Sequence, residues 1–202
     1  MPDRLYEEFF DPTEAFQREP RSFCYDIAQL MITEAKNDNA QTWYTHTKTV
    51  QAIVLLLFCW NFAAKITKKI TIEGTRGVLA QNETLLKQLE QISFLTFDEQ
   101  TEPLIRKVFT NFSRAFGQTG ATKALSLLNP SLFLMWDTKI RQRLRRSLIR
   151  GIDNGQTNDQ YLRFMYKVRE YSIHYNFQAR LDANAVLAKK IDEYHYVRII
   201  ME

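Results

Sequence analysis

Asp137 is the residue of this sequence best placed to do chemistry, because a single acid stands between an apolar run and a basic helix. The residues Phe133 to Trp136 before it are mostly apolar, and Lys139 and Arg141 follow it. A carboxylate partly shielded from water by such neighbours can stabilise a cationic sugar or orient a water molecule. The alternative is structural, since an acid at a helix start caps free N–H groups and is favoured by the helix dipole.

A glycine-bracketed turn, Gly117-Gln118-Thr119-Gly120, precedes this acid. It separates two apolar helical patterns, Leu104–Phe116 and Ala121–Leu128, and so predicts a helix–hairpin–helix. N–H groups left free at the start of the second helix can bind a phosphate without reading sequence. The carbonyl oxygens of such a turn could also hold a monovalent cation. The alternative is a turn that only joins two helices.

The helix after Asp137 is strongly basic. A solvated helix face usually carries both signs of charge, so an unbroken basic run favours an anionic partner. The basic residues are spread around the helix, and we expect two or three of them to contact that partner, unless acids elsewhere neutralise them. They are Lys139, Arg141, Arg143, Arg145, Arg146 and Arg150.

The order of these features resembles the helix–hairpin–helix DNA glycosylases, the group that includes endonuclease III. The stretch Met135–Arg141 is similar to the family's motif, whose acid faces the flipped nucleotide and supports departure of the damaged base. The resemblance implies that Asp137 is the catalytic acid, that Gly120 is the last hairpin glycine and that Ala124 is the small residue beneath it. It also implies that the partner is duplex DNA.

The sequence departs from this family at the position of a catalytic lysine. Bifunctional members carry a lysine two residues after the last hairpin glycine, and it forms a Schiff base with the sugar. Thr122 stands there in this chain, and Lys123 points about 100° away on the helix, although a shifted turn could bring it in. We therefore expect a monofunctional N-glycosylase rather than a lyase. The alternative is a non-catalytic nucleic-acid-binding or scaffold protein that retains only the fold.

The DNA-contacting residues follow from the hairpin, the basic helix and the resemblance. Asn61 matches the polar residue with which these enzymes enter the duplex. The predicted contacts are Gly117, Gly120, Thr122, Lys123, Lys139, Arg141, Arg145 and Asn61.

Most of the chain shows helical periodicity, and six glycines and five prolines are too few for a turn-rich all-β fold. We expect an all-α, helix–hairpin–helix DNA glycosylase-like fold. In the helix 21–36, a stripe of Phe23, Ile27, Leu30, Met31 and Ala35 should face the core. The stretch Thr49–Thr67 is apolar on all sides of its middle and should be the central helix.

We expect one helical domain, 1–202, either undivided or in two lobes that share a core. Its parts would be a central portion 21–116, the hairpin and basic helix 117–150, and C-terminal helices 157–202 that pack back. The longest apolar run, Val50–Ala64, is too short to span a bilayer. Two cysteines and three scattered histidines offer no metal-binding spacing. The sequence therefore predicts a cytoplasmic protein that uses no metal or small-molecule cofactor and does not bind a membrane. The resemblance further implies a prokaryotic protein associated with the nucleoid.

Overall fold

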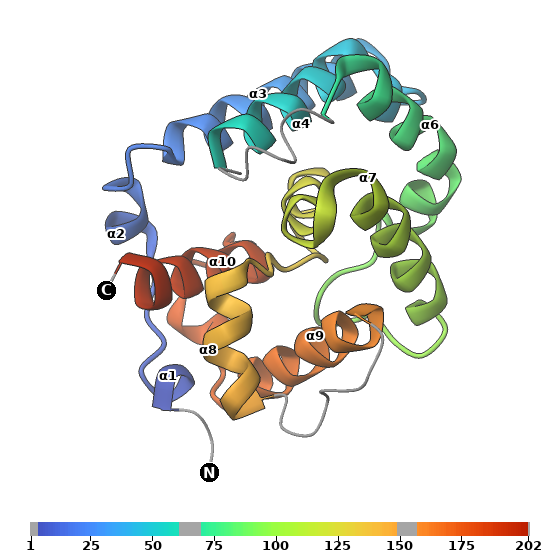
Figure 1. Ribbon diagram of the computed structural model, residues 1–202. Coiled ribbons are helices and arrows are strands. Elements are labelled where there is room, and N and C mark those ends of the chain that lie inside the picture. The colour runs from blue at the N-terminus through green and yellow to red at the C-terminus, as the bar shows by residue number, and fades with distance from the viewer. Residues whose placement is uncertain (1–3, 61–69, 149–156, 202) are drawn as a thin grey trace.

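The computed structural model describes residues 4–60, 70–148 and 157–201, and in these ranges every regular element is a helix (Figure 1). The all-α prediction is therefore confirmed for the described chain. The elements are α1 (Arg4–Glu7), α2 (Thr13–Gln17), α3 (Ser22–Asp38), η1 (Trp43–Thr45), α4 (Thr47–Trp60), α6 (Ile72–Leu89), α7 (Glu102–Leu128), α8 (Thr138–Leu148), α9 (Thr157–His174), η2 (Phe177–Arg180), α10 (Leu187–Tyr196) and η3 (Val197–Met201).

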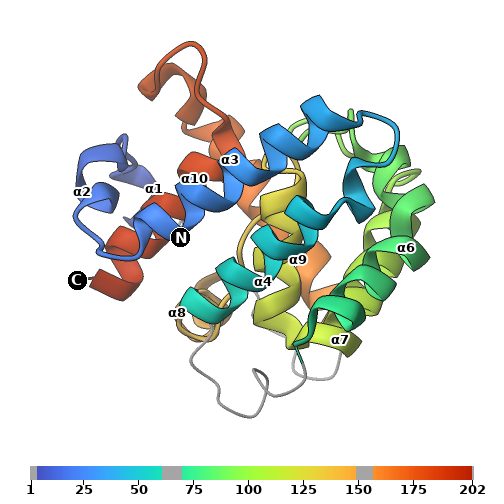
Figure 2. The ribbon, with the colours of Figure 1, turned by 90° about the horizontal axis from the view of Figure 1, so that it is seen from above.

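The helices are arranged around α7. This helix contacts α3, α4, α6 and α9, while α3 packs along α4 and α6 packs along α7 (Figure 2). The two ends of the chain meet, because α2 contacts α10 and the Tyr6 hydroxyl lies 2.9 Å from Nε2 of His195. The described part of the chain thus brings its first and last helices to one side of the molecule.

Among the described helices the second half of α7 is the most buried, and every residue from 120 to 128 is buried. The sequence predicted this role for Thr49–Thr67 instead. In α4, however, Gln51 is exposed and the Phe58 side chain is 50% exposed, so this helix has a solvent face. The prediction was wrong because an apolar composition does not reveal how many neighbours surround a helix.

The face of α3 that packs inward also differs from the predicted stripe. Phe23 is 56% exposed and Leu30 is 59% exposed, and Ile27 is exposed as well. The buried residues are Cys24, Tyr25, Ala28, Ile32 and Ala35. The sequence carries two adjacent apolar stripes, and the inward one contains two alanines, whose small side chains let α3 approach its neighbours closely.

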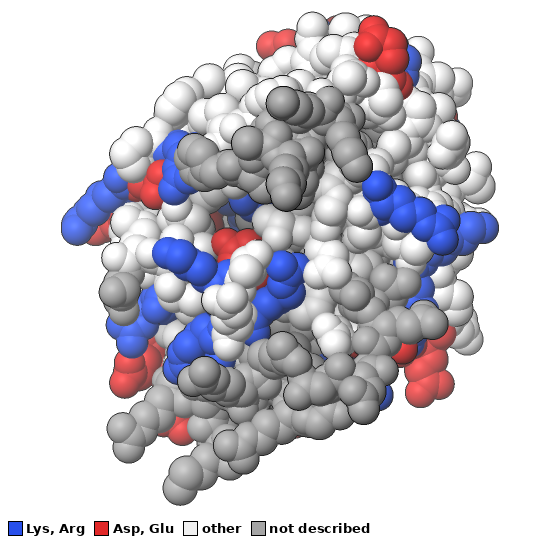
Figure 3. Space-filling model, in the orientation of Figure 1, with Lys and Arg blue, Asp and Glu red and all other residues white. Residues whose placement is uncertain are grey.

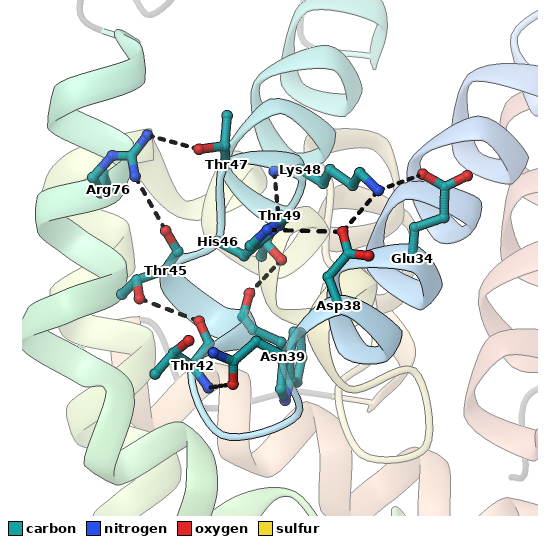
Figure 4. Close-up of polar contacts among 11 residues, drawn as sticks. Glu34, Asp38, Asn39, Thr42, Thr45, His46, Thr47, Lys48, Thr49 and Arg76 are labelled. Carbon is teal, nitrogen blue, oxygen red and sulfur yellow. Dashed lines mark hydrogen bonds and ion pairs between the residues drawn. The ribbon is translucent and has the colours of Figure 1, made fainter.

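A polar cluster holds the corner where α3, η1, α4 and α6 meet (Figure 4). The Lys48 ammonium lies 2.8 Å from the carboxylate of Asp38 and 3.1 Å from that of Glu34. The Lys48 N–H donates to Nδ1 of His46, and Arg76 of α6 donates to the carbonyl of Thr45. These contacts fix the start of α4 and give His46 a structural role.

The predicted hairpin Gly117–Gly120 is a single-residue break rather than a four-residue turn. Gly117 has φ 72° and ψ 167°, and it is the one residue of α7 with non-helical dihedrals. Gln118, Thr119 and Gly120 already belong to the helix that follows. The prediction of two helices with a glycine between them is retained, but the second helix begins about one turn earlier than expected.

Gly117→Ala should lower the free energy of unfolding by about 1–3 kcal/mol, because these dihedrals are open essentially to glycine alone. Gly77→Ala is the matched control, since Gly77 lies within α6 and a Cβ there would meet nothing within 4 Å. That variant should be more stable by about 0.5–1 kcal/mol. Urea denaturation measures both, and an unchanged midpoint for Gly117→Ala would contradict the assigned break.

Candidate active site

Asp137 stands at the start of α8, with its side chain half-buried. Its Oδ1 accepts a hydrogen bond from the N–H of Ile140 at 2.9 Å, so the carboxylate caps the helix. The same residue also lines a pocket. The sequence offered two interpretations of Asp137, a helix cap and a group that faces a concave site. One side chain can fulfil both.

The pocket has a volume of about 480 Å³, counting the space at its open mouth. Its walls are largely aromatic and aliphatic, and Phe16, Trp60 and Tyr196 contact one another there with ring centroids 5.0–6.0 Å apart. A mostly apolar lining with a few convergent charged groups is typical of ligand-binding sites. The lining residues are Phe16, Tyr25, Leu56, Trp60, Lys123, Met135, Asp137, Ile140, Lys189, Asp192, Glu193 and Tyr196.

Lys123 projects from α7 into this pocket, and its side chain is buried. Nζ donates to the carbonyl oxygen of Trp60 at 2.6 Å and lies 5.6 Å from the centroid of the Trp60 ring. Burial lowers the pKa of Lys123 to about 8, although the charge of Asp137 acts in the opposite direction. Because the ordinary pKa of lysine is far higher, the neutral, nucleophilic form of this amine is much more populated near neutral pH than in an exposed lysine.

Thr122 has no exposed surface and does not face the pocket. Its Oγ1 donates to the carbonyl of Thr119 and accepts from the N–H of Trp136, both at 3.1 Å. Gly120 is buried as well. Neither residue can contact DNA in this conformation, which corrects the role predicted for both. Lys123, which the sequence placed on the wrong side of the helix, is the residue that shares the pocket with Asp137.

The predicted basic surface is present on α8. Lys139 and Arg143 are exposed, and Figure 3 shows basic side chains gathered on this face with acidic groups among them. Arg141 is half-buried, with its guanidinium 5.5 Å from the centroid of the Trp136 ring, and it donates to Gln118 at 2.6 Å. Arg141 therefore ties α8 to the start of the second half of α7 as well as contributing charge.

Three predicted positions remain to be placed. Gly117 is half-buried at the break in α7. Asn61 and the side chain of Arg145 lie outside the described residues, and so do the side chains of Arg146 and Arg150. The predicted cation at the hairpin stays a prediction. Within the described ranges there is no group of three or more His, Cys, Asp or Glu side chains that could hold a metal ion.

Sequence reasoning missed the charged residues of α10 that line the pocket. Asp192 is buried and accepts from the N–H of Met135 at 2.7 Å, and Ser126 Oγ lies 3.2 Å from its other oxygen. Burial raises the pKa of Asp192 to about 8. Lys189 lies 3.5 Å from the centroid of the Tyr25 ring, and burial lowers its pKa. No sequence signal marked these residues, because Lys and Asp in close succession are typical of a solvated helix.

Comparisons with known proteins add no relative: no protein-family model, no curated protein and no solved structure matches this chain significantly. None of the helices in the described part of the chain has the length and apolar character of a membrane-spanning segment.

Proposed function

We propose that the protein binds duplex DNA and excises a base from it, with the chemistry performed in the pocket that contains Asp137 and Lys123. One observation carries the proposal, namely that a carboxylate and an amine of lowered pKa line the same largely apolar pocket. The resemblance of the Met135–Arg141 stretch to the helix–hairpin–helix DNA glycosylases supports it, and so does the exposed basic surface of α8.

Each of the two groups has a defined part in this chemistry. When the bond between the base and C1′ breaks, the base leaves with the bonding electrons and positive charge develops on the sugar. The Asp137 carboxylate stabilises that charge. In its neutral form the Lys123 amine can add to C1′ and lose a proton. The C1′–O4′ bond then breaks as the nitrogen lone pair forms the C=N bond and O4′ takes up a proton, so that the opened sugar is held as a protonated imine on Nζ. Lyase chemistry, which the sequence disfavoured, is therefore part of the proposal.

The second candidate function is a DNA-binding module without catalysis. The contacts of the same two residues favour it, because Asp137 caps α8 and Lys123 donates to the Trp60 carbonyl. Both interactions stabilise the fold without any substrate. In this alternative the amine and the carboxylate are buried for structural reasons, and α8 binds the phosphate backbone alone.

A base-release assay under single-turnover conditions separates the two functions. The substrates are duplexes that carry uracil, hypoxanthine, 8-oxoguanine or an alkylated base, each compared with its undamaged duplex. Release from one of them supports the glycosylase. Salt-sensitive binding without release from any duplex favours the non-catalytic module, and the absence of binding at low salt would contradict both candidate functions.

The double variant Lys139→Ala/Arg143→Ala should weaken duplex binding equally for damaged and undamaged sequences. The two side chains are exposed on α8, and each lost phosphate contact should reduce the slope of log affinity against log salt by about one. Lys107→Ala removes an exposed lysine from the first half of α7 and serves as the control. The salt slopes are measured by fluorescence anisotropy. Equal slopes for the double variant and the control would show that α8 does not contact the DNA.

A further inference from the structure

The three residues before Asp137 are each held by a side chain from a different helix. The Tyr161 hydroxyl of α9 donates to the carbonyl of Leu134 at 2.9 Å. The N–H of Met135 donates to Asp192 of α10 at 2.7 Å, and the N–H of Trp136 donates to Thr122 of α7 at 3.1 Å. We call Thr122, Tyr161 and Asp192 the anchor residues, and all three are buried.

These bonds satisfy backbone N–H and C=O groups that would otherwise be buried without a hydrogen-bond partner. Residues 134–136 lie between α7 and α8 outside any helix, so helical bonding does not supply partners for their backbone polar groups. Buried N–H and C=O groups must be hydrogen-bonded, and partners from three helices leave the segment little freedom to shift. Trp136 adds packing, because its ring stacks on that of Phe164 with centroids 5.8 Å apart. The carboxylate that follows is therefore held in one place.

The anchor residues also link this segment to the helix that carries the amine. Thr122 directly precedes Lys123 on α7, and Asp192 lies 3.2 Å from Ser126 Oγ, which is one turn further along the same helix. A shift of Asp137 relative to Lys123 would thus break contacts to α7 or to α10. In catalysis a misplacement of about 1 Å can cost about 100-fold in rate.

We propose that Thr122, Tyr161 and Asp192 are positioning residues that hold Asp137 beside Lys123. This assignment rests on the proposed function of the pocket, because it gives the fixed geometry a catalytic purpose. It also gives Thr122 a role. Thr122 stands where bifunctional DNA glycosylases of the similar family carry a catalytic lysine, and the sequence predicted it to contact DNA.

Variants that remove single bonds test the proposal by turnover. Thr122→Val keeps the side-chain shape but removes the acceptor for Trp136, and Asp192→Ala removes the acceptor for Met135. Each should lower the single-turnover rate about 10-fold or more, with duplex affinity unchanged, at temperatures well below its Tm. Asp192→Asn keeps a carbonyl acceptor and should retain most of the rate. Equal rates in all three variants and the unaltered protein would overturn the proposal.

A second measurement requires no DNA and follows the Lys123 amine itself. Formaldehyde with cyanoborohydride methylates free amines, and peptide mass spectrometry gives the rate at Lys123, with Lys107 as an exposed reference. Thr122→Val should change the Lys123 rate several-fold, but it should have no further effect in an Asp137→Asn background, because the two changes act through one carboxylate. Equal effects in both backgrounds would overturn the positioning role. The expected coupling without base release from any duplex would support the geometry and contradict the enzyme function.

Discussion

Lys123→Gln is expected to abolish covalent trapping of a duplex that contains an abasic site when borohydride is present. The neutral amine condenses with the sugar aldehyde, water leaves, and borohydride reduces the resulting imine to a stable secondary amine. A glutamine amide cannot form this imine. It can still donate to the Trp60 carbonyl as Nζ does, so the local packing should survive. The trapped complex is measured by gel shift, and its yield should fall to the level without protein.

The stability of this variant can be predicted from the sign of the pKa shift. Burial lowers the pKa of Lys123 to about 8 in the folded protein, while the unfolded chain keeps the ordinary value near 10.5. The unfolded state therefore binds the proton more tightly, and the charged lysine lowers stability as the pH falls below about 10.5, with the full penalty reached below about pH 8. Lys123→Gln removes that penalty and should not lower the Tm at pH 7. A large fall in Tm would show that the loss of trapping reflects misfolding.

Lys189→Gln is the matched control, because Lys189 is a second, partly buried lysine that lines the same pocket. It should trap as well as the unaltered protein, and trapping should rise with pH through about 8 as Lys123 loses its proton. If trapping persists in Lys123→Gln but disappears in Lys189→Gln, the nucleophile belongs to α10 and the proposed assignment is wrong. If neither variant nor the unaltered protein traps the duplex, the lyase chemistry is contradicted.

Local patterns in the sequence were sufficient to predict the helical class and the position of Asp137. Helical periodicity depends on residues three and four apart, and an acid before Thr138 at the head of a basic helix is a local capping signal. The cap to Ile140 is present as predicted. Which apolar stripe of α3 would be buried could not be predicted, because both stripes are apolar and the choice depends on distant helices.

The residues of the pocket could not be predicted from local sequence patterns either. The orientation of Lys123 depends on where the second half of α7 begins, and a break confined to Gly117 rotates every later side chain relative to the predicted four-residue hairpin. Asp192 bonds to residues 57 and 66 positions away in the chain, so no local pattern could identify it. The monofunctional and bifunctional interpretations differ in whether Lys123 faces the pocket, and that orientation depends on a single residue of the turn, Gly117.

Asp137→Asn is expected to lower the rate of base release about 10²–10⁴-fold while leaving the fold intact. The carboxylate has two separable roles, since it caps the N–H of Ile140 and presents a negative charge to the pocket. Asparagine is as good an N-cap as aspartate, so only the charge is lost. Asp137→Ser also retains a cap without the charge, and it should behave in the same way.

Asp137→Ala removes both roles and should lower the free energy of unfolding by about 1 kcal/mol in addition to the loss of activity. Thermal denaturation and single-turnover base release are measured on all three variants. All three should be inactive, and only Asp137→Ala should be destabilised. Base release that survives in Asp137→Asn would leave Asp137 with the helix cap alone. The pocket would then require another source of negative charge, and Glu193 is a further carboxylate among its lining residues.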